Sequence, residues 1–309
     1  MIKWLEDAVF YEVYPQSFRD SNGDGIGDIP GITEKLEYIQ ELGCNALWIN
    51  PCFTSPFYDA GYDVEDYYSV APRYGTNEDL KKLFEAAHQR GMHVLLDLVP
   101  GHTAVTHPWF QESMKAEKNE YTDRYVWTDS LYKRMEDVKG IVSVLRGISP
   151  RPASCGVNCF STQPALNYGF ANITDAGWQQ PTDAPGPMAT REELKNIMRF
   201  WLTLGCDGFR VDMAGSLVKN DEDKKETIRL WQDVRAFLNK ERRWYPSGEN
   251  RRWHWKRDLI WTFICILEIP VIWICSGEII LILVEIRRVI SLYLQGSLQK
   301  IRRICGGKA

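Results

Sequence analysis

Arg210 and Asp212 are the residues of this 309-residue chain whose types and spacing best suit catalysis. They stand two apart in Gly208-Phe-Arg-Val-Asp212, a run typical of a buried strand, so both side chains point to one face of it. An arginine in such a position favours the ionised form of the carboxyl group. An ionised Asp in a pocket suits a nucleophile that attacks an electron-poor carbon such as an anomeric centre, although many strand Asp residues are only structural.

Asp97 and His102 form a second polar pair, at the end of the apolar run 92–99. A purely structural strand would finish with apolar residues. The predicted strands 92–99 and 208–213 instead carry polar residues near their ends. Because parallel strands end at one edge of a sheet, we expect the two pairs to meet there.

The elements that would position these residues alternate between strands and helices. Apolar runs predict strands at residues 8–14, 45–49, 92–99 and 208–213. Helical spacing predicts helices at 33–42, 77–91, 190–204 and 226–238, with Asn77 as one N-cap and Thr190 to Glu193 as a capping box. Four such units predict a parallel α/β architecture with its site at the carboxyl ends of the strands.

Composition excludes several functional classes. With 25% charged and 44% hydrophobic residues the chain is neither disordered nor a disulfide-rich miniprotein, and its net charge of −4 favours no nucleic acid partner. Neutral ligands such as sugars fit this balance better. The eight cysteines are scattered and the first residues lack the apolar core of a signal peptide, so we expect a cytoplasmic location.

Six motifs, in order, resemble the α-amylase family of glycoside hydrolases. They are Phe10 to Phe18, Asp20 to Asp28, Gly61-Tyr-Asp63, Asp97 to His102, Gln163-Pro-Ala-Leu-Asn167 and Gly208 to Asp212. The resemblance is strongest to the branch of α-glucosidases and oligo-1,6-glucosidases and covers residues 1–241. It implies a (β/α)8 barrel of the TIM type, of which this chain carries about the first four βα units.

The resemblance divides the chain into parts. Residues 1–100 would form the first part of the barrel, 101–187 a small domain inserted after the third strand, and 188–241 the fourth βα unit. Residues 242–309 show no such resemblance. Half a barrel would leave its first and fourth strands as unpaired edges, which favours aggregation.

The resemblance also implies roles for individual residues. Asp212 would be the nucleophile of a retaining hydrolase and Arg210 its charge partner, while the non-reducing glucose would be held by Asp59, Tyr62 and His102. The implied substrates are short oligosaccharides with α-glucosidic bonds. An α-glucan transglycosylase, such as a trehalose-forming or sucrose-acting enzyme, shares these motifs and stays open as an alternative.

Three positions depart from the family pattern. Gly101 stands where Asn usually precedes the histidine, and Ala165 replaces the Asp of the usual Gln-Pro-Asp-Leu-Asn motif. Met213 follows the nucleophile, where relatives often carry Val for 1,6-linkages or Ala for 1,4-linkages. The preferred linkage therefore stays open.

The loop from Asp20 to Asp28 places oxygen donors at alternate positions, as an EF-hand does at its start. It is not an EF-hand, because Gly31 occupies the twelfth position, where a bidentate Glu belongs. The resemblance implies a structural Ca²⁺ or Mg²⁺, whose ligands would be Asp20, Asn22, Asp24, the Ile26 carbonyl and Asp28. An Asp, Asn and Gly turn without an ion is the alternative.

The tail differs in charge from the rest of the chain. Residues 1–241 carry 25 basic and 36 acidic side chains, a net −11, whereas residues 242–309 carry 12 and 5, a net +7. A retaining glycosidase needs a second carboxyl group about 5 Å from the first, which the family supplies on the fifth strand. Glu249 is the nearest acid, but no apolar strand precedes it, so we do not expect it to be catalytic.

Two explanations compete for the apolar stretch 259–284. It is long enough to cross a bilayer, but Glu268, Pro270 and Glu278 would be costly there, so we expect no membrane span. The other explanation is a shift of the reading frame near Glu241, which makes the chain a truncated family member.

The single codon of Trp allows a partial test of that shift. Joining the last base of one codon to the first two of the next forces Val, Ala, Glu, Asp and Asp at the five junctions that follow Trp244, Trp253, Trp255, Trp261 and Trp273. With permitted codons elsewhere, the shifted text can begin V-S-E-W-G, which looks like the family's fifth strand. The Glu of that strand, its general acid/base, would be encoded across Pro246 and Ser247.

These observations predict a carbohydrate enzyme that lost its proton donor. The expected ancestral reaction is hydrolysis of terminal α-glucosidic bonds in an oligosaccharide substrate, and the chain as it stands is expected to be inactive. A non-catalytic sugar-binding subunit and the product of a defunct gene remain as alternatives. Oligomeric state stays undetermined.

Overall fold

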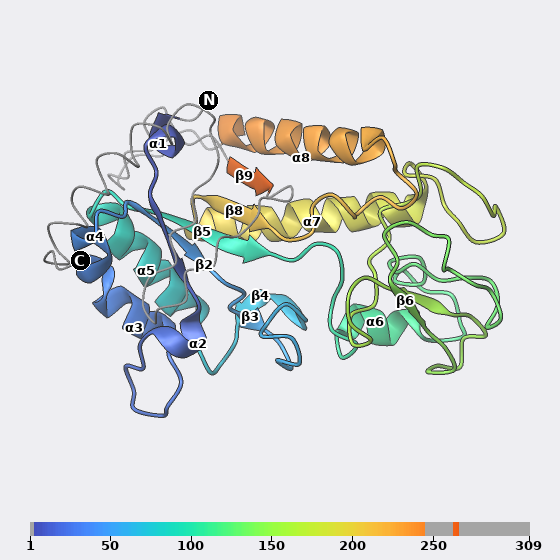
Figure 1. The fold of residues 1–309 in the computed structure, drawn as a ribbon, viewed down its shortest axis with the longest axis horizontal. Coiled ribbons are helices and arrows are strands. Elements are labelled where there is room, and N and C mark those ends of the chain that lie inside the picture. The colour runs from blue at the N-terminus through green and yellow to red at the C-terminus, as the bar shows by residue number, and fades with distance from the viewer. Residues whose placement is uncertain (1–2, 245–261, 266–309) are drawn as a thin grey trace, which may run out of the picture. The chain divides into compact units, whose positions relative to one another are not determined.

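A computed structural model describes residues 3–244 and 262–265 of the chain (Figure 1). Its helices are α1 Lys3–Glu6, α2 Pro15–Phe18, α3 Ile29–Glu34, α4 Leu36–Glu41, α5 Asn77–Gln89, α6 Pro108–Ser113, α7 Pro185–Leu204 and α8 Lys225–Trp244. Its strands are β1 Phe10–Val13, β2 Ala46–Ile49, β3 Phe53–Thr54, β4 Asp66–Val70, β5 His93–Leu98, β6 Ser143–Leu145, β7 Cys155–Val157, β8 Gly208–Val211 and β9 Thr262–Cys265.

A parallel sheet in the order β1-β2-β5-β8-β9 organises the described residues. Each pair is in parallel register, with Ala46 opposite both Phe10 and His93, and Asp97 opposite Arg210. The four predicted strands are therefore present, in the predicted chain order, with helices between them. Figure 1 shows α7 and α8 lying side by side, and their residues are in contact.

The edge of the sheet differs from the sequence-based expectation. Residues 262–265 of the tail form β9, which pairs with β8 in parallel, Phe209 opposite Phe263. The expectation that the fourth strand would be an unpaired edge is therefore wrong, because a short apolar segment of the tail supplies the missing main-chain partners. The rest of the apolar stretch 259–284 and Glu249 lie outside the described residues.

Two predicted helix starts were wrong. Thr76, not Asn77, is the N-cap of α5, and it forms a capping box with Asp79. The predicted capping box at Thr190 is absent, because α7 begins five residues earlier with Pro185 in its first turn. Proline is already set to the helical φ there, and the Thr190 hydroxyl instead donates to the Gly186 carbonyl within the helix.

The predicted helix 33–42 is also longer and divided. It begins at Ile29, because the Asp28 carboxylate accepts a hydrogen bond from the Gly31 N–H at 2.6 Å and caps α3. Lys35 then separates α3 from α4. The Asp28 carboxylate also accepts hydrogen bonds from the N–H and the hydroxyl of Ser21, and so closes the loop from Asp20 to Asp28.

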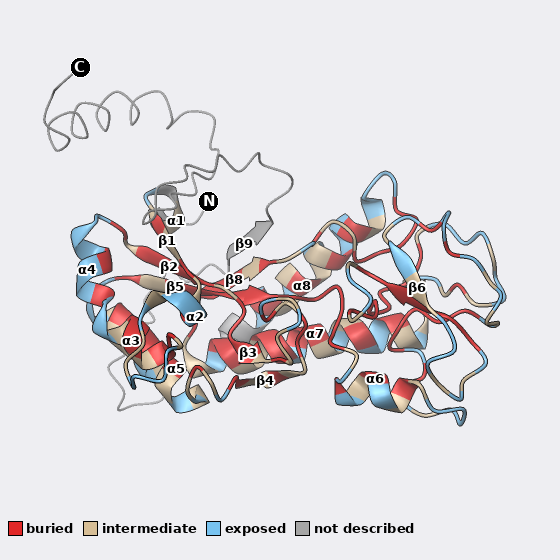
Figure 2. Ribbon diagram, turned by 60° about the horizontal axis from the view of Figure 1, so that its bottom comes forward, coloured by how far each residue is buried: buried red, intermediate tan, exposed pale blue. Residues whose placement is uncertain are grey.

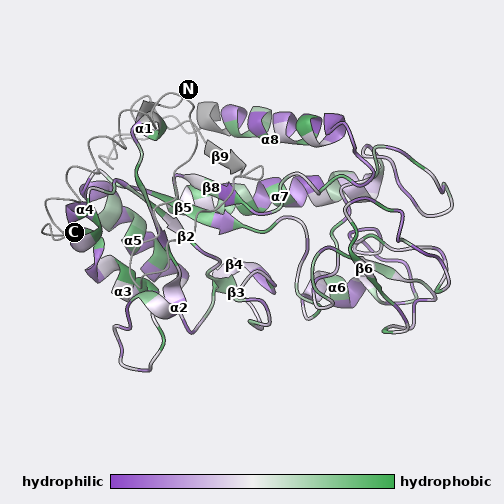
Figure 3. Ribbon diagram, viewed as in Figure 1, coloured by the Kyte–Doolittle hydropathy of each residue, from purple (hydrophilic) through white to green (hydrophobic). Residues whose placement is uncertain are grey.

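The core lies between the sheet and its helices. Strand residues alternate less than in a half-exposed sheet: β2 and nearly all of β5 are buried throughout, as expected when helices cover a parallel sheet (Figure 2). The long helices α5, α7 and α8 alternate between hydrophobic and hydrophilic residues along their length (Figure 3). Their apolar stripes therefore face the sheet.

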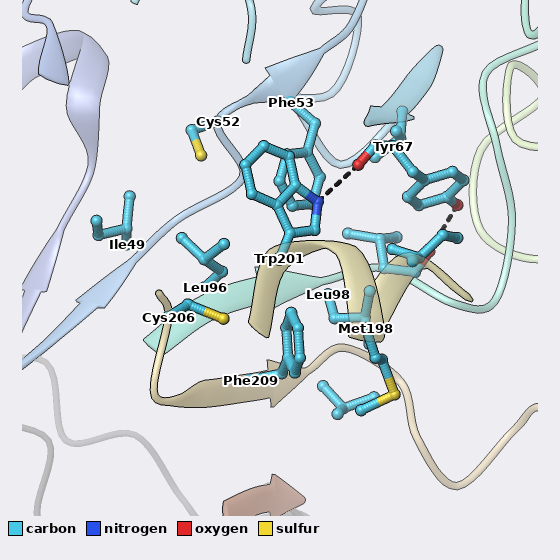
Figure 4. Packing of buried hydrophobic residues seen from close by; sticks show 14 of the residues in the cluster. Ile49, Cys52, Phe53, Tyr67, Leu96, Leu98, Met198, Trp201, Cys206 and Phe209 are labelled. Atoms are coloured by element: carbon cyan, nitrogen blue, oxygen red, sulfur yellow. Dashed lines mark hydrogen bonds between the residues drawn. The ribbon is translucent and has the colours of Figure 1, made fainter. Parts of the chain in front are cut away.

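Trp201 of α7 anchors this core (Figure 4). Its ring stacks on Phe53 with centroids 5.0 Å apart, and its indole N–H donates to the Tyr67 carbonyl at 2.7 Å. The single polar atom of a large buried side chain is thus satisfied. These contacts join α7 to β3 and β4, the strands on either side of the loop that carries part of the candidate site.

Residues 101–187 contain α6 and the antiparallel pair β6 and β7. They hold a second, smaller apolar cluster, built from Val126, Met135, Val138, Ala165 and Phe170. Within residues 3–244 and 262–265, none of the helices combines the length and apolar character needed to span a bilayer.

Asp207 joins two histidines at the amino end of β8. Its carboxylate lies 2.8 Å from His88 Nε2 and 3.2 Å from His93 Nδ1, and it accepts the Val94 N–H at 2.7 Å. Burial opposes protonation of His88, but its hydrogen bond and charge interaction with Asp207 outweigh that effect and raise the His88 pKa. This cluster lies at the end of the sheet opposite Asp212, where residues usually serve stability.

We expect a pH dependence of stability from this pair. His88 has a pKa above its ordinary 6.5, so its contribution is complete below that value and is lost as pH rises through the raised pKa. His88→Gln keeps a donor but no charge, and should lower the free energy of unfolding by about 1–2 kcal/mol near pH 6 and by little near pH 9. Urea unfolding at both pH values measures this.

His107→Gln is the matched control for that measurement. Burial lowers the pKa of His107 to about 3, so this histidine is neutral throughout the range and its replacement should cost the same at both pH values. A cost of His88→Gln that does not change with pH would contradict the proposed charge interaction.

Candidate active site

Asp97, Arg210 and Asp212 meet at the carboxyl ends of β5 and β8. Arg210 Nη1 donates to Asp97 Oδ1 at 3.0 Å and to Asp212 Oδ1 at 2.9 Å. The predicted proximity of Arg210 and Asp212 is therefore present, and it follows from their spacing of two on one strand. Asp97 joins them because it lies opposite Arg210 in the parallel register.

Burial, not the arginine, dominates the electrostatics of Asp212. Burial raises the Asp212 pKa, the charge and hydrogen bond of Arg210 lower it, and the result is a pKa above the ordinary value. Arg210 therefore favours the ionised form of Asp212, as expected, but burial has the larger effect on the pKa. Burial likewise raises the pKa of Asp97 to about 7, with Arg210 opposing and Asp212 adding to the shift.

Asp97 is held by two further donors and by a second contact with Arg210 Nη1. The indole N–H of Trp48 donates to Asp97 Oδ2 at 3.0 Å, the Tyr62 hydroxyl donates to the same oxygen at 3.2 Å, and Arg210 Nη1 also approaches that oxygen at 3.3 Å. Arg210 lies over the Trp48 ring, 4.9 Å from its centroid. Asp97 is 1% exposed and both of its oxygens are occupied, so it is placed to position its neighbours.

Glu12, Trp48 and Asn50 also belong to this site, although the sequence alone did not indicate them. Asn50 Nδ2 donates to Glu12 Oε1 at 3.2 Å and lies 3.3 Å from the Tyr62 hydroxyl. These residues extend the polar network to β1 and β2. A signal existed, because Glu12 and Asn50 are polar residues within or directly after short apolar strands, the criterion that identified Asp97.

A tight loop between β3 and β4 carries Asp59 and Tyr62. Asp63 organises it by accepting hydrogen bonds from Ser55 Oγ at 3.0 Å, the Tyr58 N–H at 2.9 Å and the Asp59 N–H at 3.1 Å. The Asp59 carboxylate in turn accepts a bond from Gln163 Nε2 at 2.6 Å. Gln163 therefore ties this loop to the segment 101–187.

His102 is buried and both of its ring nitrogens are occupied. Nε2 lies 3.0 Å from the Tyr62 carbonyl oxygen, and Nδ1 lies 3.0 Å from Asn158 Nδ2. Burial lowers the pKa of His102 to about 4, so the ring is neutral near pH 7. His102 thus contacts the backbone of Tyr62, a residue to which the family resemblance gives a role in the same site.

Met213, the residue after Asp212, has strained geometry. Its φ is +46°, a left-handed value that is uncommon outside glycine, and its side chain is 40% exposed. Its sulfur lies 3.7 Å from Asn158 Nδ2. The nucleophile candidate is therefore followed by a sharp turn that presents a thioether to solvent beside the His102 region.

Three buried polar atoms near this site have no hydrogen-bond partner among the described residues. They are Asn50 Oδ1, Asn158 Oδ1 and Arg210 Nε. Unsatisfied buried groups are costly, and native proteins usually pair them with protein, water or ligand. Their gathering around Asp97, Asp212 and His102 is what a site built for a hydroxyl-rich ligand would show.

The loop from Asp20 to Asp28 is held by its own backbone. Asp20 accepts N–H bonds from Gly25 at 2.8 Å, Gly23 at 2.6 Å and Asn22 at 3.1 Å, and these bonds lower its pKa. Within the described part of the chain, no three His, Cys, Asp or Glu side chains gather into a group that could hold a metal.

The donors of that loop nevertheless keep free lone pairs. A carboxylate has about four acceptor sites. Asp20 uses three of them, Asp24 accepts from the Ile26 N–H and Asn22 Nδ2, and Asp28 accepts from Ser21 and Gly31. The donor types fit a hard cation, although the carboxylates are not gathered around one point.

A parallel sheet with an arginine-bound carboxylate at the carboxyl ends of its strands is the arrangement expected for part of a (β/α)8 barrel. The family described as the catalytic domain of alpha amylase matches residues 12–250, and this chain belongs to that family. The (β/α)8 fold predicted from the sequence is thereby confirmed for the part of the barrel that the chain contains.

Two groups of relatives share this domain. The oligo-1,6-glucosidase of Bacillus sp. (strain F5) is 38% identical over 219 residues, which are 71% of this chain and 40% of that protein. The trehalose synthase/amylase TreS of Mycolicibacterium smegmatis is 40% identical over 243 residues, 77% of this chain and 37% of that protein. The chain thus spans about two fifths of the length of these curated relatives.

Solved structures give the same picture. The alpha-glucosyl transfer enzyme XgtA aligns with a TM-score of 0.62 at 32% identity, covering 77% of this chain and 48% of that one. The trehalulose synthase MutB from Pseudomonas mesoacidophila MX-45 aligns with a TM-score of 0.60 at 33% identity, covering 78% and 42%.

Proposed function

We propose that this chain carries the first half of a retaining glycoside hydrolase that acts on α-glucosidic bonds of short oligosaccharides. The contact of Arg210 with Asp212 at 2.9 Å, at the carboxyl ends of the strands, is the observation that carries this proposal. Asp59, Tyr62 and His102 would line the pocket of the non-reducing glucose, in which the two ring nitrogens of His102 bind protein groups. Similarity to an oligo-1,6-glucosidase and to an α-glucosidase of Pediococcus pentosaceus supports the substrate class.

In the proposed reaction the Asp212 carboxylate attacks the anomeric carbon. The bond from that carbon to the leaving oxygen breaks, a glycosyl ester forms on Asp212, and water later hydrolyses the ester with retention. Arg210 keeps one Asp212 oxygen oriented, which leaves the other oxygen for the attack. The departing oxygen needs a proton from a second carboxyl group.

Two carboxyl groups of the described residues, those of Asp97 and Asp59, interact electrostatically with Asp212, and neither is suited to donate the proton. Asp97 is buried under four contacts, and Asp59 accepts the short bond from Gln163. We propose that the coding sequence after Glu241 is read out of frame and that the chain has therefore lost its proton donor. In the shifted frame that donor is the Glu encoded across the codons of Pro246 and Ser247. Genomic reads across these codons test this: a stop or unrelated residues in the shifted frame would refute it.

The domain assignment is also a proposal. Residues 1–100 and 188–241 would belong to the barrel, 101–187 to the inserted small domain and 242–309 to the out-of-frame tail. The separate apolar cluster around Phe170 supports the inserted unit. For the location we propose the cytoplasm, and the free thiols of the described cysteines agree with a reducing compartment.

Release of glucose tests the hydrolase directly. The frame-corrected protein, in which the shifted text replaces the tail, should release glucose from maltose, isomaltose or both, and the ratio of the two rates assigns the linkage. Failure to cleave either sugar, or an aryl α-glucoside, would refute the proposed function.

A transglycosylase is the second candidate, favoured by the 40% identity to TreS and the structural similarity to MutB. Product analysis separates the two. A transglycosylase would convert maltose or sucrose into an isomeric disaccharide with little free glucose, whereas a hydrolase would release glucose in proportion to substrate consumed.

We also propose that a structural Ca²⁺ or Mg²⁺ binds the loop from Asp20 to Asp28. Millimolar Ca²⁺ should then raise the melting temperature by about 2–4 °C, because a ligand that binds only the folded chain stabilises it. Asp24→Asn should abolish this response, because it removes the charge of one carboxylate ligand. Asp24 is the better position to change, since it accepts one backbone N–H whereas Asp20 accepts three, so its replacement disturbs the loop less. An equal response to NaCl of matched ionic strength would contradict a specific site.

A further inference from the structure

Gly101 and Asn158 occupy one space. A Cβ atom at Gly101 would lie 2.6 Å from Asn158 Nδ2 and 3.4 Å from its Cγ. Real Cβ atoms essentially never approach another atom that closely, and the Gly101 backbone is not in the left-handed region that itself requires glycine. Glycine is therefore needed at position 101 because the amide of Asn158 fills the place of a side chain.

Asn158 is fixed from several directions. It is 1% exposed, its N–H donates to the Gln163 carbonyl at 3.1 Å, and its Nδ2 donates to His102 Nδ1 at 3.0 Å. Gln163 in turn holds the Asp59 carboxylate at 2.6 Å. One short segment of the inserted region thus contacts both His102 and Asp59, which come from different loops.

The hydrogen bonds around His102 define its tautomer. Its Nε2 faces the Tyr62 carbonyl oxygen, which only accepts, so Nε2 must carry the proton. Nδ1 is then an acceptor and requires a donor, which the amide NH₂ of Asn158 supplies. With the amide turned over, an oxygen would face the unprotonated Nδ1, so both contacts together determine the amide orientation.

We propose that Asn158 is a positioning residue that holds His102 as the neutral Nε2–H tautomer, with its ring directed at the Tyr62 carbonyl, and that Gly101 is required to admit it. The inference rests on the proposed function only in treating His102 as part of the sugar pocket. Asn158 Oδ1, which has no hydrogen-bond partner among the described residues, is left as an acceptor for water or a sugar hydroxyl.

Imidazole ¹⁵N NMR of the full chain tests the tautomer without any sugar. The parent should show His102 as Nε2–H, assigned by its loss in His102→Gln. Asn158→Asp keeps the shape but can only accept, so the Nδ1 of His102 must become protonated and the His102 pKa should rise from about 4 by more than one unit. Asn172→Asp, which removes a bond to the Asn220 carbonyl, should leave His102 unchanged.

A double-mutant cycle tests the shared space. Gly101→Ala should lower the melting temperature in the parent but clearly less in an Asn158→Ala background, where the clash is gone. Asn158→Ala also serves if Asn158→Asp folds poorly, because it should release the fixed tautomer. Additive effects of the two alanines, or an unchanged His102 spectrum in both Asn158 variants, would overturn the inference.

These outcomes are separable from failure of the proposed function. Absence of glucosidase activity in the frame-corrected protein would refute the function and leave the NMR result standing. Conversely, a His102 signal that ignores Asn158 would overturn this inference even in an active enzyme.

Discussion

Asp212→Asn in the frame-corrected protein is expected to lower kcat/KM for an aryl α-glucoside by at least about 10⁴-fold, as loss of a covalent nucleophile does in other enzymes. The amide is nearly isosteric and can still face Arg210, so the substitution removes nucleophilic charge while disturbing little packing. Initial rates at several substrate concentrations measure the effect.

Rescue by a small anion makes this prediction specific. In Asp212→Ala, azide could occupy the space of the missing carboxylate and attack the anomeric carbon as the aryl oxide leaves. One displacement replaces two, so the product should be a glycosyl azide of inverted, β configuration. The parent should give products of retained α configuration.

Asp221→Asn is the matched control. Asp221 is also buried, and its carboxylate accepts the Thr227 N–H at 2.7 Å near the start of α8. Its replacement should lower stability and leave kcat nearly unchanged. Near-parental activity of Asp212→Asn would refute both the nucleophile assignment and the mechanism built on it.

The chain as it stands should be slower than the frame-corrected protein on maltose by at least about 10²- to 10⁴-fold, the loss expected from the missing proton donor alone. The deficit should depend on the leaving group. Fluoride leaves α-glucosyl fluoride with little help from an acid. The rate of the frame-corrected protein divided by that of the chain as it stands should therefore be much smaller with this substrate than with maltose.

A variant of the frame-corrected protein separates loss of the acid from damage to the fold. Changing the restored Glu of the fifth strand to Gln should reproduce the leaving-group pattern of the uncorrected chain while keeping the corrected fold. Equal deficits on maltose and on the fluoride would instead mean that the tail disrupts the pocket, and equal rates for both proteins would refute the frameshift.

Local patterns were sufficient for much of the fold. The apolar runs at β2, β5 and β8 predict buried strands because a sheet covered by helices on both faces tolerates few polar residues. Helix starts were less predictable. Thr190 had the capping pattern, yet Pro185 and contacts of α7 with β4 extended the helix beyond it.

The sequence alone determined the pairing of Arg210 with Asp212, since two residues on one strand share a face whatever the surroundings. Only the tertiary structure decided that Asp97 lies against Arg210, that Glu12 and Asn50 join the network, and that β9 covers the edge at β8. It also decided that burial outweighs Arg210 in setting the Asp212 pKa and that Asn158 fills the space beside Gly101. Strand register, burial and close approach involve residues far apart in the chain, and no local spacing encodes them.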